Sequence, residues 1–464
     1  MYLIPHSWSH LHMLASVFPP FGLLFTLGFY IAGLRSGNEG IKRTCLVVFI
    51  GLALLSVPIY LSGEGAASPA SPKIAKEMLG AHTIAGIASL IALLVTGLAA
   101  LVELWRARRS PIDPRYVVLA LAVVTLGVMA VASELGFETS HRELQSSVVI
   151  PDVTTSPIWP HAHVIVNHVP TVGFAFAIFF YLVALLINNA GMKRGSLVLF
   201  IITAIVGVPT YVSGTASMWA LTQPPQPDIS KAVINAHRDM ALWTLVGLTF
   251  TGGAAWIELW RYRQLGRFSR LSLAVVPLLA LVTLAVMTET GHRGGLVTHP
   301  EFRSATEIVP ADPDAGVSMA LESEMKSIAW FMPWQIVHFF GYSLIFGSLL
   351  AVSLRVLGFW RSLSFAAVHR LLVLGFVGVL MNVLSGMLMM LADSYRYVVS
   401  DILFAPKVAL IPLGVMAALY FSVSEPLWRL KPGEAAPAAA KWVTVGSLLA
   451  WAGVIACGRL LPYL

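Results

Sequence analysis

Charged side chains are scarce in this chain. Asp, Glu, Lys and Arg make up 11% of the 464 residues, whereas hydrophobic residues make up 57%. Soluble domains carry about 25% charged residues, so the composition excludes an ordinary soluble fold. Neither a P-loop nor a dinucleotide-binding glycine fingerprint occurs, and we therefore expect no bound nucleotide. The net charge of +7 is explained by membrane topology, so the sequence does not call for a nucleic-acid partner.

Cysteine is almost missing as well. The two cysteines, Cys45 and Cys457, fall at opposite membrane levels in the predicted helices and cannot form a disulfide. No C-x-x-C-H motif occurs, which excludes covalently attached c-type heme. The N-terminus also lacks the basic region of a cleaved signal peptide, and we expect the first hydrophobic segment to be retained.

Long hydrophobic runs dominate the rest of the sequence. A helix needs about 20 apolar residues to cross a bilayer. Short alternating segments, which are typical of membrane β-barrels, do not occur. The pattern predicts an all-α integral membrane protein with about twelve transmembrane helices. These cover about 10–34, 43–62, 80–105, 116–136, 163–188, 195–213, 234–260, 270–289, 335–357, 366–392, 405–423 and 442–462.

Basic residues gather in the loops at one end of the predicted helices. These loops are 34–43, 105–110, 192–195, 260–270, 354–361 and 427–431. Cytoplasmic loops carry the excess of Lys and Arg, which predicts a bacterial inner-membrane protein with both termini in the periplasm. Of the 13 histidines, only His369 then falls near the cytoplasmic face. Because ionisable groups at membrane depth are functional candidates, a periplasmic layer of histidines suggests metal or heme sites.

The first 300 residues or so contain a duplication. Residues 9–22 match 160–173 and 57–63 match 208–214, while 80–86 match 235–241 and 102–106 match 257–261. The segment 139–144 aligns with 297–302. Each repeat holds four predicted helices. We therefore expect three four-helix bundles, and the boundaries are repeat one at 1–150, repeat two at 151–305, a periplasmic linker at 306–330 and a C-terminal unit at 331–464.

Histidines recur at matching positions of the two repeats. His12 and His82 fall near one level in repeat one, and His163, His168 and His237 do so in repeat two. Two histidines on facing helices of a bundle commonly hold a b-type heme. His163 and His168 cannot share one iron from the same helix face. Since Val17 replaces the counterpart of His168 in repeat one, the pairs His12/His82 and His163/His237 are the primary metal ligands expected.

Further residues accompany these pairs. His141 and His299 follow the last helix of each repeat near the same level, and Tyr60 and Tyr211 end the second helices there. The tyrosines are candidates to bond heme propionates, and a purely structural role is equally open. Zinc or copper are alternative ions, because imidazole suits both.

A family resemblance rests on short motifs. His163, His168-Val169-Pro170, Ala236-His237-Arg238 and Gly294-Gly295 followed by His299 resemble the pattern of uncharacterised four-helix bacterial membrane domains. Repeat one keeps His12, Pro19, His82 and His141. The resemblance covers about 1–305 and implies two b-type hemes. The unit at 331–464 resembles another uncharacterised family of small bacterial membrane domains, which implies no chemistry.

The function expected is electron transfer through bis-histidine hemes near the periplasmic face. Such ligation leaves no open iron position, which favours electron transfer over oxygen chemistry. Expected partners are lipid, membrane quinone and a periplasmic cytochrome or other redox subunit, as in a quinol–cytochrome oxidoreductase. Two alternatives stay open at this point: a polytopic transporter or channel, and a cofactor-free anchor subunit of a larger complex.

Overall fold

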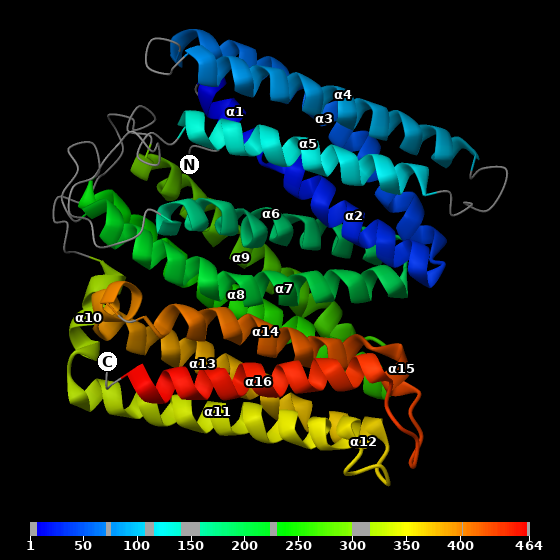
Figure 1. Cartoon of the computed structure of the whole chain (residues 1–464), viewed down its shortest axis with the longest axis vertical. Coiled ribbons are helices and arrows are strands. Elements are labelled where there is room, and N and C mark those ends of the chain that lie inside the picture. Colours follow the sequence, from blue (N-terminus) through cyan, green and yellow to red (C-terminus); the bar gives the residue numbers. More distant parts are fainter. Residues whose placement is uncertain are drawn as a thin grey trace. The chain divides into compact units, whose positions relative to one another are not determined.

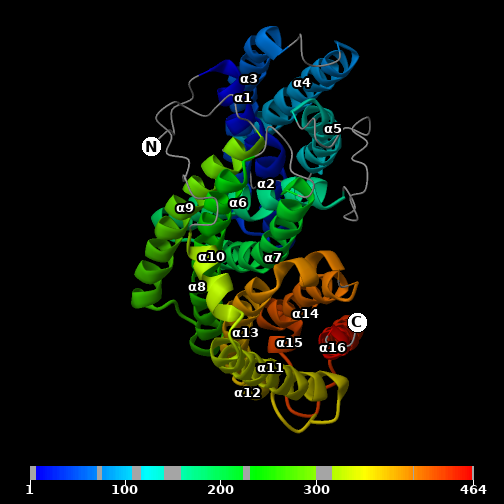
Figure 2. The same cartoon turned by 90° about the vertical axis from the view of Figure 1, so that its left-hand side faces the viewer.

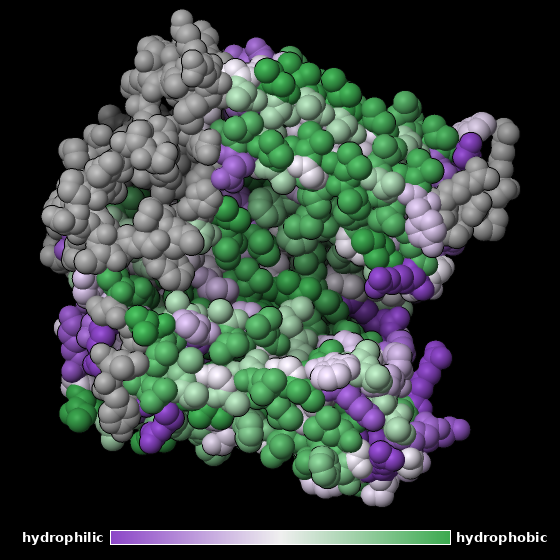
Figure 3. Space-filling view, viewed as in Figure 1, coloured by the Kyte–Doolittle hydropathy of each residue, from purple (hydrophilic) through white to green (hydrophobic). Residues whose placement is uncertain are grey.

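The computed structural model describes residues 7–70, 76–106, 116–140, 158–222, 230–298, 316–400 and 402–461. Within these ranges every regular element is a helix, and twelve helices are long and apolar enough to cross a membrane. Apolar side chains cover the flanks of the helices, and hydrophilic ones gather near helix ends (Figure 3). The chain is thus an all-α polytopic membrane protein, as its composition predicts.

The helices of the two repeats follow the predicted order (Figure 1). The first predicted helix is divided into α1 and α2, because Pro19 and Pro20 remove backbone donors in the first turn of α2. The bounds in repeat one are α1 Trp8–Ser16, α2 Phe18–Ser36, α3 Glu39–Ala70, α4 Lys76–Arg106 and α5 Val117–Ser140. Those in repeat two are α6 Ile158–Leu186, α7 Ala190–Thr222, α8 Lys231–Leu265 and α9 Arg270–Thr298.

The C-terminal unit contains four long helices, which lie side by side as one group (Figure 2). They are α11 Ile328–Leu357, α13 Leu372–Ala392, α14 Phe404–Val423 and α16 Ala438–Leu460. Shorter elements connect them: α12 Phe365–His369, the π-helix η3 Arg396–Ser400 and α15 Glu425–Trp428. The four long helices therefore form one bundle.

The described part of the predicted linker contains a helix, α10 (Val317–Met325). Asp239 of α8 accepts hydrogen bonds from the backbone nitrogens of Val317 and Ser318, at 3.1 and 2.7 Å. A carboxylate at a helix N-terminus satisfies donors that have no partner within the helix. Asp239 therefore attaches α10 to the second repeat.

Two compact units make up the chain. The first consists of Met1–Pro151 and Val172–Ser196, and the second of Asp152–Thr171 and Leu197–Leu464. Helices α6 and α7 therefore contribute residues to both units. The reason for this division lies in the packing of 172–196 against repeat one.

Equivalent residues of the two repeats contact each other inside the first unit. Phe29 stacks on Phe180 with ring centroids 4.2 Å apart and planes at 13°. Asn38 and Asn189 exchange two amide hydrogen bonds of 3.2 and 2.9 Å. A residue that meets its own counterpart is typical of a two-fold interface, as in a homodimer. The duplication is therefore visible in side-chain contacts as well as in the sequence.

The same asparagines begin helices. Asn38 accepts a bond from the backbone nitrogen of Ile41, and Asn189 accepts one from that of Met192. The residue before each is left-handed: Gly37 has φ 65° and Asn188 has φ 48°. Gly and Asn tolerate this conformation best, and it ends a helix. The loop between the first two long helices therefore has the same left-handed residue and the same asparagine cap in both repeats.

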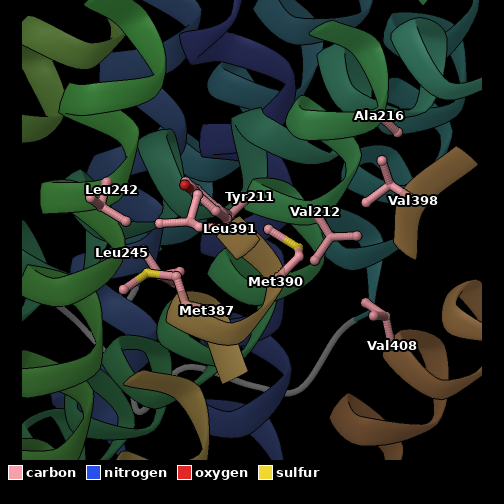
Figure 4. Packing of buried hydrophobic residues seen from close by; sticks show 10 residues of the cluster. All are labelled: Tyr211, Val212, Ala216, Leu242, Leu245, Met387, Met390, Leu391, Val398 and Val408. Carbon is pink, nitrogen blue, oxygen red and sulfur yellow. The ribbon is translucent and has the colours of Figure 1, made fainter. Parts of the chain in front are cut away.

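A buried apolar cluster joins the second repeat to the C-terminal helices within the second unit (Figure 4). Tyr211, Leu242 and Leu245 of α7 and α8 pack against Met387 and Met390 of α13. In a membrane, close packing of this kind replaces the hydrophobic effect as the main attraction between helices. The cluster therefore fixes α13 against α7 and α8.

We predict that Asn38 and Asn189 stabilise the protein through the hydrogen bonds that they share. Asn38→Ala should lower the free energy of unfolding by about 1 kcal/mol, because a helix cap is lost and the Asn189 amide loses its partner. The double variant with Asn189→Ala should cost less than the sum of the two single variants, since they share the same bonds. Thermal unfolding in detergent measures this.

Ser343→Ala is the control, because the Ser343 hydroxyl is exposed and bonds a carbonyl of its own helix. It should leave the unfolding temperature unchanged. Additive losses from the two asparagines would contradict a direct interaction between them.

Candidate functional site

The structure brings together both histidine pairs that the sequence predicts. His12 of α1 faces His82 of α4 with ring centroids 6.4 Å apart and planes at 74°. His163 of α6 faces His237 of α8 with centroids 6.5 Å apart and planes at 72°. The two pairs thus have the same geometry, although each is built within its own unit.

A backbone carbonyl on a neighbouring helix holds each ring. Nδ1 of His12 lies 3.0 Å from the Ile59 oxygen, and Nδ1 of His163 lies 3.1 Å from that of Thr210. The second histidines follow the same rule: Nδ1 of His82 lies 3.1 Å from the Ala132 oxygen, and Nδ1 of His237 lies 2.9 Å from that of Thr290. A carbonyl only accepts, so Nδ1 carries the proton and Nε2 of the neutral ring keeps a lone pair.

Serine hydroxyls support the first histidine of each pair. Ser62 Oγ lies 3.2 Å from Nδ1 of His12, and Ser213 Oγ lies 3.2 Å from Nδ1 of His163. Each serine donates its own proton to the same carbonyl that the histidine uses. The serine oxygen is therefore an acceptor for the imidazole N–H, which strengthens the choice of tautomer.

A glycine lies against each of the four rings. A Cβ on Gly63 would be 2.8 Å from Cε1 of His12, and one on Gly214 would be 2.8 Å from Cε1 of His163. The corresponding distances are 2.7 Å for Gly136 and His82 and 2.9 Å for Gly294 and His237. Any larger residue would displace the imidazole, so the glycines create the space in which each ring stands.

The second pair borders a cavity of about 100 Å³. Its walls come from α6, α7, α8 and α9 and are mostly apolar. The lining residues include His163, Pro170, Gly207, Leu245, His237 and Met287. The cavity therefore extends from the histidine level along the interior of the bundle.

Two polar groups of the cavity wall lack hydrogen bonds that they are able to make. The hydroxyl of Tyr211 is buried and makes no well-formed hydrogen bond, although the side chain of Arg238 lies close to it. Nε of Arg238 is also buried and unbonded, although its two terminal nitrogens donate to Glu322 of α10 at 3.3 and 3.2 Å. A buried unsatisfied donor is costly, so these groups are poised for an acceptor that enters the cavity.

The first repeat differs at both positions. The Tyr60 hydroxyl is exposed and donates to Glu64 at 2.8 Å. Thr83 takes the place of Arg238 and bonds the Leu79 carbonyl of its own helix. The sequence predicts the same role for Tyr60 and Tyr211, but the structure places the two residues in different environments.

The other predicted histidines do not complete either pair in the described part of the chain. Nδ1 of His168 bonds the Val164 carbonyl one turn earlier in α6, and His163 is the ring that faces His237. His141 and His299 lie outside the described residues. In the described part of the chain, no three His, Cys, Asp or Glu side chains converge to hold a metal ion.

Some site residues escaped sequence reasoning. Ser62 and Gly63 lie inside the repeat block 57–63, but the repeat pattern does not show that they contact His12. Gly136 and Gly294 are separated by the same offset as His141 and His299. That shared offset is a signal in the duplication that pairs the two glycines, although it does not show that they contact histidines.

No family model, curated protein or solved structure matches the chain.

We predict that adjacent glycines respond in opposite ways to alanine. Gly294→Ala should destabilise the protein by about 1–3 kcal/mol, because overpacking displaces His237. Gly295→Ala is the matched control: a Cβ there meets no atom within 4 Å. Alanine is the better helix former, so this variant should keep or raise the unfolding temperature. Equal losses in both variants would contradict the contact with His237.

Proposed function

We propose that each histidine pair holds one b-type heme and that the protein transfers electrons near the periplasmic face of the bacterial inner membrane. The observation that carries this proposal is the repeated geometry of the two pairs. An imidazole nitrogen bonds a transition metal at about 2.0 Å, so two rings on opposite sides of one ion have centroids about 6 Å apart. The measured separations of 6.4 and 6.5 Å fit this value.

The chemistry of the donor set also fits an iron porphyrin. Each pair offers two imidazole nitrogens with lone pairs, held by bonds at Nδ1. Two protein ligands suffice for a porphyrin iron, because the macrocycle supplies the other four. Zinc sites usually need three or four protein ligands. The pairs therefore favour heme over a bare ion.

The cavity beside His163 and His237 gives further support. Its walls are mostly apolar, and the polar groups of Tyr211 and Arg238 suit a carboxylate. A porphyrin is larger than this cavity of about 100 Å³, so heme binding would have to widen it. Arginine binds carboxylates strongly through charge-assisted hydrogen bonds. In this proposal Tyr211 and Arg238 orient a propionate, while the two histidines fix the iron. The first repeat lacks an arginine at this position and binds its heme without that anchor.

Each residue of the two sites then has one role in electron transfer. A bound heme would supply one-electron redox chemistry, and His12 with His82 or His163 with His237 would hold its iron. The carbonyls of Ile59, Ala132, Thr210 and Thr290 keep the imidazoles in one orientation and make them better donors. Apolar walls exclude water from the ring. Membrane quinone and a periplasmic redox protein are the partners that this location favours.

We predict that each pair accounts for half of the bound heme. The reduced-minus-oxidised absorbance spectrum and a pyridine hemochrome assay of the purified protein should give a b-type spectrum at about two hemes per chain. His82→Ala and His237→Ala should each remove about half, because each breaks one pair. His168→Ala is the control and should retain both hemes. Unchanged heme content in the first two variants would refute the assignment, as would a featureless spectrum of the heme-supplied wild type.

We also predict that Tyr211→Phe has opposite effects on two quantities. Without heme the variant should unfold at an equal or higher temperature, because it removes a buried hydroxyl that has no partner, a group that costs about 1–3 kcal/mol. With heme supplied, it should lose heme from the second site more readily. Tyr60→Phe is the control and should change neither quantity. A lower unfolding temperature for heme-free Tyr211→Phe would mean that the hydroxyl already has a structural partner.

A further inference from the structure

The C-terminal bundle repeats the contacts of a first histidine. His338 of α11 places Nδ1 3.0 Å from Oγ of Ser385 on α13. The next residue, Gly386, lies against the same ring, since a Cβ there would be 3.2 Å from Cε1. The first two bundles present the same Ser-Gly dipeptide to His12 and His163. Helix α13 is therefore related to α11 as α3 is to α1 and α7 to α6.

In the C-terminal bundle, Lys407 makes the glycine contact that the second histidine makes in the other two bundles. Lys407 lies near the start of α14 and follows His338 by nearly the same number of residues as His82 follows His12. A Cβ on Gly458 of α16 would be 3.5 Å from Nζ of Lys407. In the other bundles the glycine of the fourth helix lies against His82 or His237. Lys407 thus stands where the second histidine is expected.

We infer that the C-terminal bundle is a divergent third copy of the histidine-pair bundle, in which the ammonium group of Lys407 replaces the second histidine and closes the site to metal. This inference rests on the proposed function for the meaning of the first two pairs. It assigns His338 and Lys407 to one cation-filled site, meaning a site in which the ammonium group of Lys407 occupies the position of a metal ion. This site binds no heme.

Hydrogen bonding distinguishes the site of His338 and Lys407 from the two histidine pairs. Ser385 donates its proton to the Met381 carbonyl at 2.6 Å, so its oxygen accepts from Nδ1 of His338. Nε2 of His338 is then an acceptor. In each histidine pair both rings keep an Nε2 lone pair, and in the proposed function a metal ion would accept both. An ammonium group is a donor only, so in the proposed site Lys407 would donate to Nε2 of His338 and no metal would be needed.

Charge and position agree with this assignment. Lys407 is close enough to His338 for the two side chains to interact electrostatically. Lys407 is half-buried, and a lysine within a membrane helix is unfavourable unless a partner compensates it. In the proposed site the imidazole lone pair of His338 supplies that compensation. The remaining task of the third bundle is packing, since Met387 and Met390 of α13 contribute to the core with α7 and α8.

The test is to restore the second histidine in the full-length protein and count hemes by pyridine hemochrome. Lys407→His should raise the content from about two to about three per chain. Lys407→Leu is the matched control and should stay at two, because leucine has no atom that ligates iron. His338→Ala combined with Lys407→His should also stay at two. Where the wild type holds two hemes, no increase in a Lys407→His protein that unfolds at the wild-type temperature would overturn the inference. A wild type that already holds three hemes would overturn it as well.

A second measurement is independent of heme. His338→Ala, Lys407→Met and their combination form a cycle whose thermal unfolding reports the contact. The double variant should lose several degrees less than the sum of the single losses. Additive shifts would overturn the inference. A wild type with no heme but a coupled cycle would refute the proposed function alone and leave the cation-filled site supported.

Discussion

A backbone carbonyl that accepts from Nδ1 is the interaction on which the rest of each site depends. A histidine side chain turns freely at two bonds and has two tautomers, so its residue type alone does not define a ligand. In both pairs the carbonyl comes from a neighbouring helix, which fixes the tautomer and the direction of Nε2 at once. The glycine beside each ring leaves that orientation sterically possible. Helix packing therefore decides the chemistry of the imidazoles.

The membrane makes this arrangement stable. Helices satisfy their own backbone groups in lipid, and interhelical contacts then come from small residues and close packing. Glycines such as Gly63 and Gly294 serve both needs, because they bring helices together and make room for a ring. The asparagine pair Asn38 and Asn189 acts at the helix ends, where it caps two helices and joins the repeats' equivalent loops.

The duplicated sites are alike in their histidine pairs and unlike in their surroundings. Both pairs share ring spacing, carbonyl contacts and glycines, yet only the second has a buried arginine and a buried tyrosine at its cavity. A cation near a redox centre stabilises its reduced form, so the two proposed hemes would differ in potential. The third bundle extends the series, because it keeps the first histidine with its Ser-Gly partner and carries Lys407 at the second position.

The sequence by itself determined the membrane class, the helix count and the two histidine pairs. Hydrophobic length follows directly from bilayer thickness, and a duplicated motif identifies equivalent residues without any coordinates. Tertiary structure alone decided which atoms hold His12 and His237, that Tyr211 is buried while Tyr60 is exposed, and that Lys407 lies where a histidine is expected. Those facts depend on helix rotation and on contacts between residues far apart in the chain. A hydrophobic pattern fixes neither, because many rotations bury an apolar helix equally well.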